Sequence, residues 1–185
     1  MTLIVLVIIL VVVGFTLAGV YNRLVGLRQN ANQAFADIDV QLKQRQDLVP
    51  NLVETVKGYA AHEKGTLEAV TNARAAAVAA PNVEQRVQAE NVLTGALRQL
   101  MAVSEAYPDL KANAGFMQLQ GELSDIENKL AAARRFFNNT VSEYNASIQQ
   151  FPAVLLAGAM GFSQRPFFDL GENRAAAETA PQVKF

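Results

Sequence analysis

The chain has no cysteine, no tryptophan and one histidine among its 185 residues. The absence of cysteine excludes disulfides, thiolate metal sites and a cysteine nucleophile. A formal net charge of -1 leaves no broad basic surface, which argues against nucleic acid as a partner, because such binding depends on neutralising phosphates. The composition therefore argues against these classes of site and partner, and the apolar and helical patterns of the chain carry more information.

Charge is also absent from residues 3–20, and the first charged side chain after them is Arg23. At ~1.5 Å per helical residue, about 18 residues span roughly 27 Å, close to the ~30 Å hydrocarbon layer of a bilayer. We therefore expect residues 1–21 to form a transmembrane anchor that enters the bilayer from the N-terminus. Its lipid-facing and interfacial residues are predicted to be Leu3, Leu6, Leu10, Val13, Leu17, Val20 and Tyr21.

A cleaved secretory signal is the alternative interpretation of this run. Such a signal needs a basic region before a shorter apolar core and a cleavage site of small residues. No Lys or Arg precedes the run, and Ala18-Gly19-Val20-Tyr21 is a poor cleavage context, so we expect a retained anchor. The only basic flank, Arg23 and Arg28, favours an external N-terminus and a cytoplasmic domain.

The remaining chain has the periodicity of amphipathic helices. Apolar residues recur in steps of three and four over 31–59, 67–77, 83–107 and 116–151, which is typical of faces buried between helices. The stripe passes through Pro50, so a kink is favoured there, with the turn near 58–65 and a connection at 109–115. The predicted fold is all-α: a transmembrane helix that continues into an up-down antiparallel four-helix bundle, with residues 22–151 as the bundle domain.

Summed along the bundle, the expected helix lengths bring the end of the last helix back toward the membrane. The segment that follows, 152–171, begins with the apolar run AVLLAGAMGF at 153–162 and includes Phe167 and Phe168. It is too short to cross a bilayer, so it either contacts the membrane surface or a partner, or packs under the bundle. Residues 172–185 are small and polar, which is typical of disorder.

No catalytic, cofactor or metal site is evident. Position 59 is tyrosine, so His62 lacks the Glu-x-x-His pattern of dinuclear carboxylate bundles, and His62 with Glu63 is interpreted as a turn or capping element. No nucleophile or phosphate-binding motif occurs, so we expect no enzyme activity. Arg45 falls on the apolar stripe, where it should pair with a carboxylate of another helix or subunit, unless it reaches solvent.

Several blocks of the chain resemble the LemA family. The most specific are DLVPNLV, GYAAHE, AYPDLKAN and the block RRFFNNTVSEYN, within a resemblance that extends from Tyr21 to Phe168. The resemblance implies a bacterial membrane protein with one N-terminal span, an outward N-terminus and a long helical bundle, and we place it in the cytoplasmic (inner) membrane. It also implies an unsettled molecular role, with some members linked to membrane biogenesis. The run at 153–159 is more apolar than the family pattern.

Helices that are apolar on more than one side predict a second partner. On the last helix, Phe136 lies beside the stripe residue Phe137, so lateral self-association is expected. Our leading hypothesis is a homo-oligomeric scaffold that organises membrane, with the bilayer and itself as partners. The alternative is an adaptor or sensor that recruits another membrane protein, such as a protease. The predicted interaction or structural residues are Arg45, Pro50, His62, Glu63, Phe116, Phe137, Tyr144, Phe162, Phe167 and Phe168.

Overall fold

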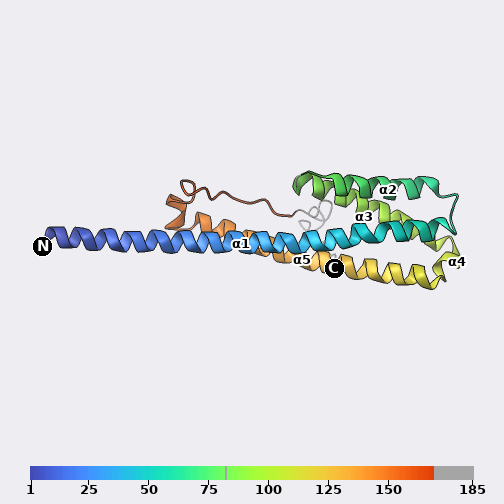
Figure 1. Ribbon diagram of the computed structural model, residues 1–185, viewed down its shortest axis with the longest axis horizontal. Coiled ribbons are helices and arrows are strands. Elements are labelled where there is room, and N and C mark those ends of the chain that lie inside the picture. Colours follow the sequence, from blue (N-terminus) through green and yellow to red (C-terminus); the bar gives the residue numbers. More distant parts are fainter. Residues whose placement is uncertain (82, 169–185) are drawn as a thin grey trace, which may run out of the picture. The chain divides into compact units, whose positions relative to one another are not determined.

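The fold is all-helical over residues 1–81 and 83–168, the part of the chain that this computed structural model describes. In chain order its elements are α1 (Thr2–Lys57), α2 (Lys64–Ala79), α3 (Val83–Glu105), α4 (Pro108–Lys111), α5 (Ala114–Gln149) and the 3-10 turn η1 (Ala153–Leu155) (Figure 1). The all-α prediction is confirmed.

The apolar N-terminal segment and the first bundle helix form one helix, α1. The stretch after Tyr21 contains no proline, and its apolar residues keep the helical spacing, so nothing ends the helix there. Pro50 lies inside α1, which continues to Lys57 before the turn to α2. The prediction that the chain turns near 58–65 rather than at Pro50 is therefore confirmed.

The chain divides into two compact units. The anchor unit comprises Met1–Ile38 and Ala132–Phe167, and the four-helix unit comprises Asp39–Ala131 and Phe168. Each unit contains one part of α1 and one part of α5. The expected boundaries of the bundle domain at residues 22 and 151 stay predictions, and residues 169–185, including the expected disordered tail, lie outside the described residues.

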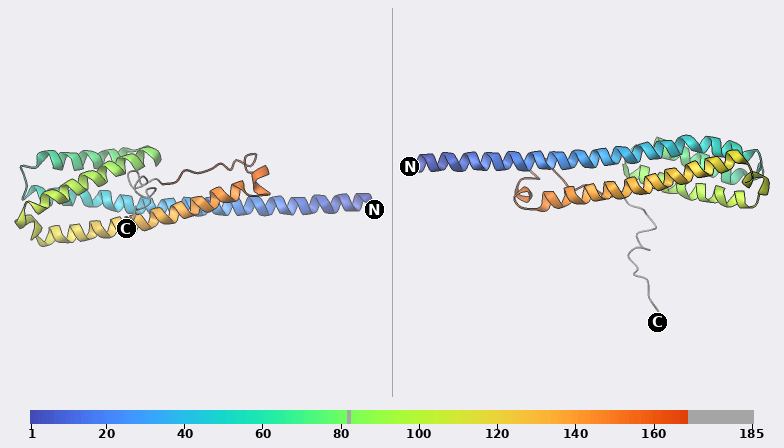
Figure 2. Two further views of the ribbon diagram at one scale, coloured as in Figure 1. Left: turned by 180° about the vertical axis from the view of Figure 1, so that it is seen from behind. Right: turned by 90° about the horizontal axis from the view of Figure 1, so that it is seen from below.

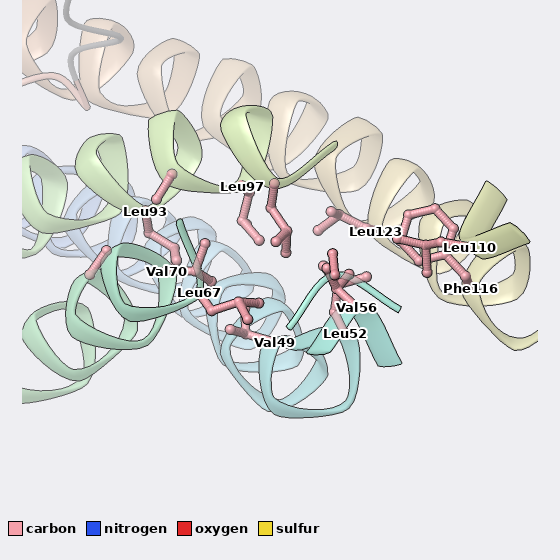
Figure 3. Packing of buried hydrophobic residues seen from close by; sticks show 14 of the residues in the cluster. Val49, Leu52, Val56, Leu67, Val70, Leu93, Leu97, Leu110, Phe116 and Leu123 are labelled. Carbon is pink, nitrogen blue, oxygen red and sulfur yellow. The ribbon is translucent and has the colours of Figure 1, made fainter. Parts of the chain in front are cut away.

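In the four-helix unit, α1, α2, α3 and α5 enclose a common apolar core, which α4 extends. Figure 3 shows core side chains from each helix converging: Val49, Leu52, Val56, Leu67, Val70, Leu93, Leu97, Leu110, Phe116 and Leu123. Asp39 pairs with Arg86, and Arg45 pairs with Glu90 further along both helices. Thus α1 and α3 run parallel, and short turns make α2 and α5 antiparallel to them.

In the anchor unit, α1 packs antiparallel to the last part of α5. The rings of Phe35 and Phe137 meet edge to face with centroids 5.6 Å apart, and Leu24 packs with Tyr144 and Ile148. Residue numbers fall along α1 as they rise along α5, so α5 runs toward the N-terminal segment. Figure 2 shows residues 153–167 beside this part of α1.

Two sequence-based expectations are wrong. The connection expected at 109–115 is interrupted by helix α4, which begins at Pro108 and buries Leu110. Proline suits this first position because its missing N–H would lack an intrahelical partner anyway. Phe151 was expected on the buried stripe of the last helix, but α5 ends at Gln149 and Phe151 is 80% exposed.

Candidate functional site

Most of the apolar N-terminal part of α1 is not covered by the rest of the described chain. Within the described residues, α1 is the one helix long and apolar enough to cross a membrane, and none of the residues in its apolar window is buried. Leu3, Leu6, Leu10 and Val13 are exposed, while Leu17 and Val20 are partly covered. A continuous apolar surface of this length suits a bilayer rather than water, and it indicates a single-span membrane protein.

Directly after this surface, the C-terminal segment packs against α1. Phe162 is buried, and its ring meets the Tyr21 ring edge to face at 5.7 Å between centroids. The Arg28 guanidinium lies over the Phe162 ring, 4.9 Å from its centroid. A cation and an aromatic ring attract each other in this arrangement. Ala153 and Ala157 join the same cluster with Tyr144. Phe162 and Tyr144 thus tie the segment to both helices.

Polar contacts hold the end of this segment in place. The Tyr144 hydroxyl donates to the Ser163 carbonyl at 3.0 Å. The Asn145 amide donates to the Arg165 carbonyl and accepts from the Arg165 N–H, both at 2.9 Å, so it pairs with the backbone as a neighbouring strand would. Arg165 in turn donates to the Arg28 carbonyl at 3.3 Å. The segment is therefore a fixed part of the anchor unit.

Part of residues 153–162 packs against the helices, as one of the two expectations has it, whereas contact with a membrane surface or a partner stays a prediction. Ala153, Ala157 and Phe162 are buried against the helices, whereas Val154 and Leu155 are 50% and 72% exposed. Phe167 is also exposed, whereas Phe168, which is grouped with the four-helix unit, is buried.

The four-helix unit contains a buried ion cluster around Arg45, whose side chain is 0% exposed. Its Nη2 group binds the buried carboxylate of Glu90 on α3. Its Nη1 group donates to Glu127 Oε1 on α5 at 2.5 Å and to Thr94 Oγ1 at 2.9 Å. Gln46 Nε2 donates to the second Glu90 oxygen at 2.6 Å. The predicted pairing of Arg45 with a carboxylate of another helix is confirmed, and the solvent-reaching alternative is wrong.

Pro50 creates a second polar contact at the same level of α1. Because proline has no N–H, the Gln46 carbonyl loses its normal helical donor. Arg74 of α2 supplies a replacement, with Nε donating to the Gln46 oxygen at 2.6 Å. The proline is thus matched by an arginine on the neighbouring helix, which explains how α1 continues through it.

The turn before α2 holds the lone histidine. His62 is exposed in the turn, and Glu63 occupies the N-cap position of α2 without a side-chain capping bond. Instead, Glu63 Oε1 accepts a hydrogen bond from the Tyr107 hydroxyl at 3.2 Å. Burial raises the pKa of Tyr107, and the charge and hydrogen bond of Glu63 raise it further. This contact stabilises the fold while Tyr107 is protonated and is lost as the pH rises through its pKa.

Among the side chains that the structure describes, no three His, Asp or Glu residues gather as metal ligands. A surface groove of about 390 Å³ does run between α1 and α5 in the four-helix unit. Leu48 and Ile126 supply apolar atoms, and the carboxylates of Asp47, Glu122 and Asp125 line it with Lys129. This groove suits a basic segment of another molecule better than a small reactive substrate.

Comparison with known proteins places these features in a family. A model described as the LemA family matches residues 34–185, which is most of the chain. The chain belongs to the LemA family. The match begins after the apolar N-terminal run and includes every helix of the four-helix unit, so the family assignment rests on the bundle and not on the anchor.

This LemA-family chain is also similar to individual curated proteins. It is 25% identical to the magnetosome protein MamQ of Magnetospirillum gryphiswaldense over 174 residues, covering 80% of this chain and 64% of that protein. Magnetosome protein MamQ 2 of Paramagnetospirillum magneticum matches with the same identity and coverage. Protein LemA of Metamycoplasma hominis is 27% identical over 142 residues, covering 74% of this chain and 63% of that protein. The chain therefore spans less than two thirds of the length of these relatives.

Several of the contacts described above were not predicted from the sequence. Glu90 lies three residues from both Val87 and Leu93 on the stripe of α3, so the helical period alone marks it as buried. The Arg74 contact also has a local signal, because Pro50 must leave the Gln46 carbonyl without its helical donor. Asn145 and Arg165 had no comparable signal, since their pairing depends on how the C-terminal segment folds back.

Proposed function

We propose that this LemA-family protein is a non-enzymatic scaffold that self-associates at a membrane and organises the bilayer there. The observation that supports self-association most directly is Phe136, a large aromatic residue that is 55% exposed on the anchor unit. The same helix α1 forms both the apolar span and part of each unit, so assembly of the helical part would act directly on the membrane anchor.

The anchor unit buries apolar surface between two helix segments, which can cover only one face of each. Phe137 is buried against Phe35, but Phe136 points away from that contact and stays exposed. Exposed aromatic residues of this kind are enriched at protein interfaces. Anchoring confines the molecules to two dimensions and raises their effective concentration, which favours contact between copies.

We place the protein in the bacterial cytoplasmic (inner) membrane. The positions of its positive charges support an orientation with the bundle in the cytoplasm and the N-terminus outside. The sequence places Arg23 and Arg28 just after the apolar span, and the fold brings Arg165 against Arg28. Positive residues close to a span favour the cytoplasmic side. The absence of an enzyme activity is proposed from the sequence, which carries no catalytic motif and whose one histidine, His62, lies exposed in a turn.

The Phe136→Glu variant tests the self-association part. A carboxylate at the centre of an apolar contact is expected to weaken association about tenfold or more, equivalent to ~1.4 kcal/mol or more. The measurement is the fraction of crosslinked oligomer in native membranes, or the distribution of particle masses in nanodiscs, at equal expression.

Ser142→Glu is the matched control, because Ser142 is also exposed on α5 in the anchor unit but faces away from Phe136. It should assemble like the unaltered chain. Equal assembly of the two variants would contradict a role for Phe136, and crosslinking that captures other proteins but never a second copy would contradict the scaffold itself.

The acidic groove lined by Leu48, Ile126 and their neighbouring carboxylates favours a second candidate function. In that case the protein is an adaptor or sensor that recruits another membrane protein, such as a protease, through a basic segment. A stoichiometric complex with a different protein, weakened by Glu122→Lys but not by Phe136→Glu, would support the adaptor over the scaffold.

A further inference from the structure

The exposed side chains of the C-terminal segment form an apolar tip next to the membrane anchor. The tip consists of Phe151, Val154 and Leu155, which are all at least half exposed. We propose that this tip is a second membrane contact, which inserts into the boundary between headgroups and acyl chains of an anionic leaflet beside the anchor. The inference depends on the membrane anchoring in the proposed function and not on self-association.

Contacts within the anchor unit fix the level of the tip along α1. Val20, the last residue of the apolar run, packs against the cluster that contains Ala153, Ala157 and Phe162. The Phe162 ring contacts Tyr21, which is the first residue after the run. Figures 1 and 2 both show η1 beside this part of α1. The tip therefore lies where the anchor leaves the hydrocarbon layer.

The tip is built so that its apolar side chains cannot turn inward. Ala153 and Ala157 already occupy the inner side of the segment, where they are buried. Gly161 has φ +74°, a conformation that residues with a side chain rarely adopt, and Phe162 N–H donates to the Ala157 carbonyl at 2.9 Å. This turn returns Phe162 to α1 and leaves Val154 and Leu155 on the outer side.

The charges around the tip suit anionic lipid. Over Met1–Ile38 and Ala132–Phe167, all of it described, the anchor unit carries five arginines and two carboxylates, Asp37 and Glu143. The whole chain, in contrast, has a net charge of -1. Arg23, Arg28 and Arg165 lie closest to the end of the anchor. Basic residues beside an apolar insertion are the usual recognition of anionic membrane surfaces.

A bilayer is favoured over a protein partner because the tip continues the apolar surface of the anchor. Lipid headgroups surround Val20 and Tyr21 at this level of the anchor. A protein partner bound to Leu155 would have to displace some of them. Lipid covers both surfaces at once without an additional molecule.

The test uses a single fluorescent label, which the natural absence of cysteine makes possible. Leu155→Cys in the full-length chain is labelled with a polarity-sensitive fluorophore and placed in vesicles of phosphatidylcholine with phosphatidylglycerol. The expected result is a blue shift of the emission and several-fold stronger quenching by spin-labelled lipid than at Ala132→Cys. Ala132 is exposed on α5 of the same unit, about 25 Å from its end at ~1.5 Å per residue.

Leu10→Cys, within the span, separates the inference from the proposed function. Quenching at position 10 with none at position 155 overturns the tip alone, whereas no quenching at either position overturns membrane anchoring and the tip together. A blue shift at 155 that grows with protein concentration and resists lipid quenching means that a second copy covers the tip, which also overturns the proposal. Unchanged quenching in pure phosphatidylcholine would overturn the preference for anionic lipid.

Discussion

Arg45→Met is expected to lower the free energy of unfolding by about 3–5 kcal/mol. The substitution leaves Glu90, which is 0% exposed, as a buried carboxylate without the guanidinium that now binds it. The loss is an uncompensated buried charge, because methionine retains most of the side-chain volume. Denaturant unfolding of the full-length protein in detergent, followed by far-ultraviolet circular dichroism, measures the change.

Lys43→Met is the matched control for this prediction. Lys43 lies two positions away on α1 and pairs with Asp47 at 3.3 Å, but both side chains are more than half exposed. An exposed pair contributes about 0–1 kcal/mol. A similar small effect for Arg45→Met would contradict the view that Arg45 compensates the buried carboxylate of Glu90.

The double variant Arg45→Met with Glu90→Leu distinguishes an unpaired charge from lost packing. Replacing both members of a buried ion pair by apolar residues is often neutral or stabilising, and Glu127 is exposed enough to be solvated when Arg45 is gone. Most of the stability lost in Arg45→Met should therefore return. A double variant that is as unstable as the single one would show that shape, and not charge, is what Arg45 supplies.

Phe116→Ala is expected to lower the free energy of unfolding by about 3–5 kcal/mol. Phe116 is 1% exposed and belongs to the core of the four-helix unit. Figure 3 shows its ring against Leu110, at the end of the core that α4 and α5 close. Truncation removes apolar contacts and leaves a cavity that the surrounding helices refill only in part. The same unfolding measurement reports the loss.

The neighbouring residue provides the control. Met117 is 53% exposed, so Met117→Ala should stay within about 0.5 kcal/mol of the unaltered chain. Equal losses at positions 116 and 117 would mean that the first turn of α5 is not ordered against the core as the structure has it.

Much of this fold follows from local signals in the sequence. The helical period at 31–59 and 116–151 predicts most of the buried faces, and the turn was expected near 58–65, where it lies. The burial of Arg45 follows from its place on the stripe, since an arginine there needs a carboxylate. The same period marks Glu90 on α3, so the helical spacing alone indicates that both members of the pair are buried.

Other features depend on tertiary contacts that have no local signal. Helix α4 buries Leu110 against the core, although the stretch at 109–115 has the composition of a connection. Phe151 fits the period of the last helix, but Pro152 ends that period and leaves Phe151 outside the helix. The division of 153–162 into a buried and an exposed side depends on Phe162 returning to Tyr21 and Arg28, which no spacing predicts.

The proposed scaffold requires that the anchored chain assembles at the membrane. The most direct test is the particle mass of the full-length protein in native nanodiscs, beside a chain that starts at Tyr21 and therefore lacks the anchor. We expect a large, discrete assembly for the full-length protein and its loss without the anchor. A monomer in both preparations would contradict the scaffold and make capture of a different partner through the acidic groove the remaining explanation.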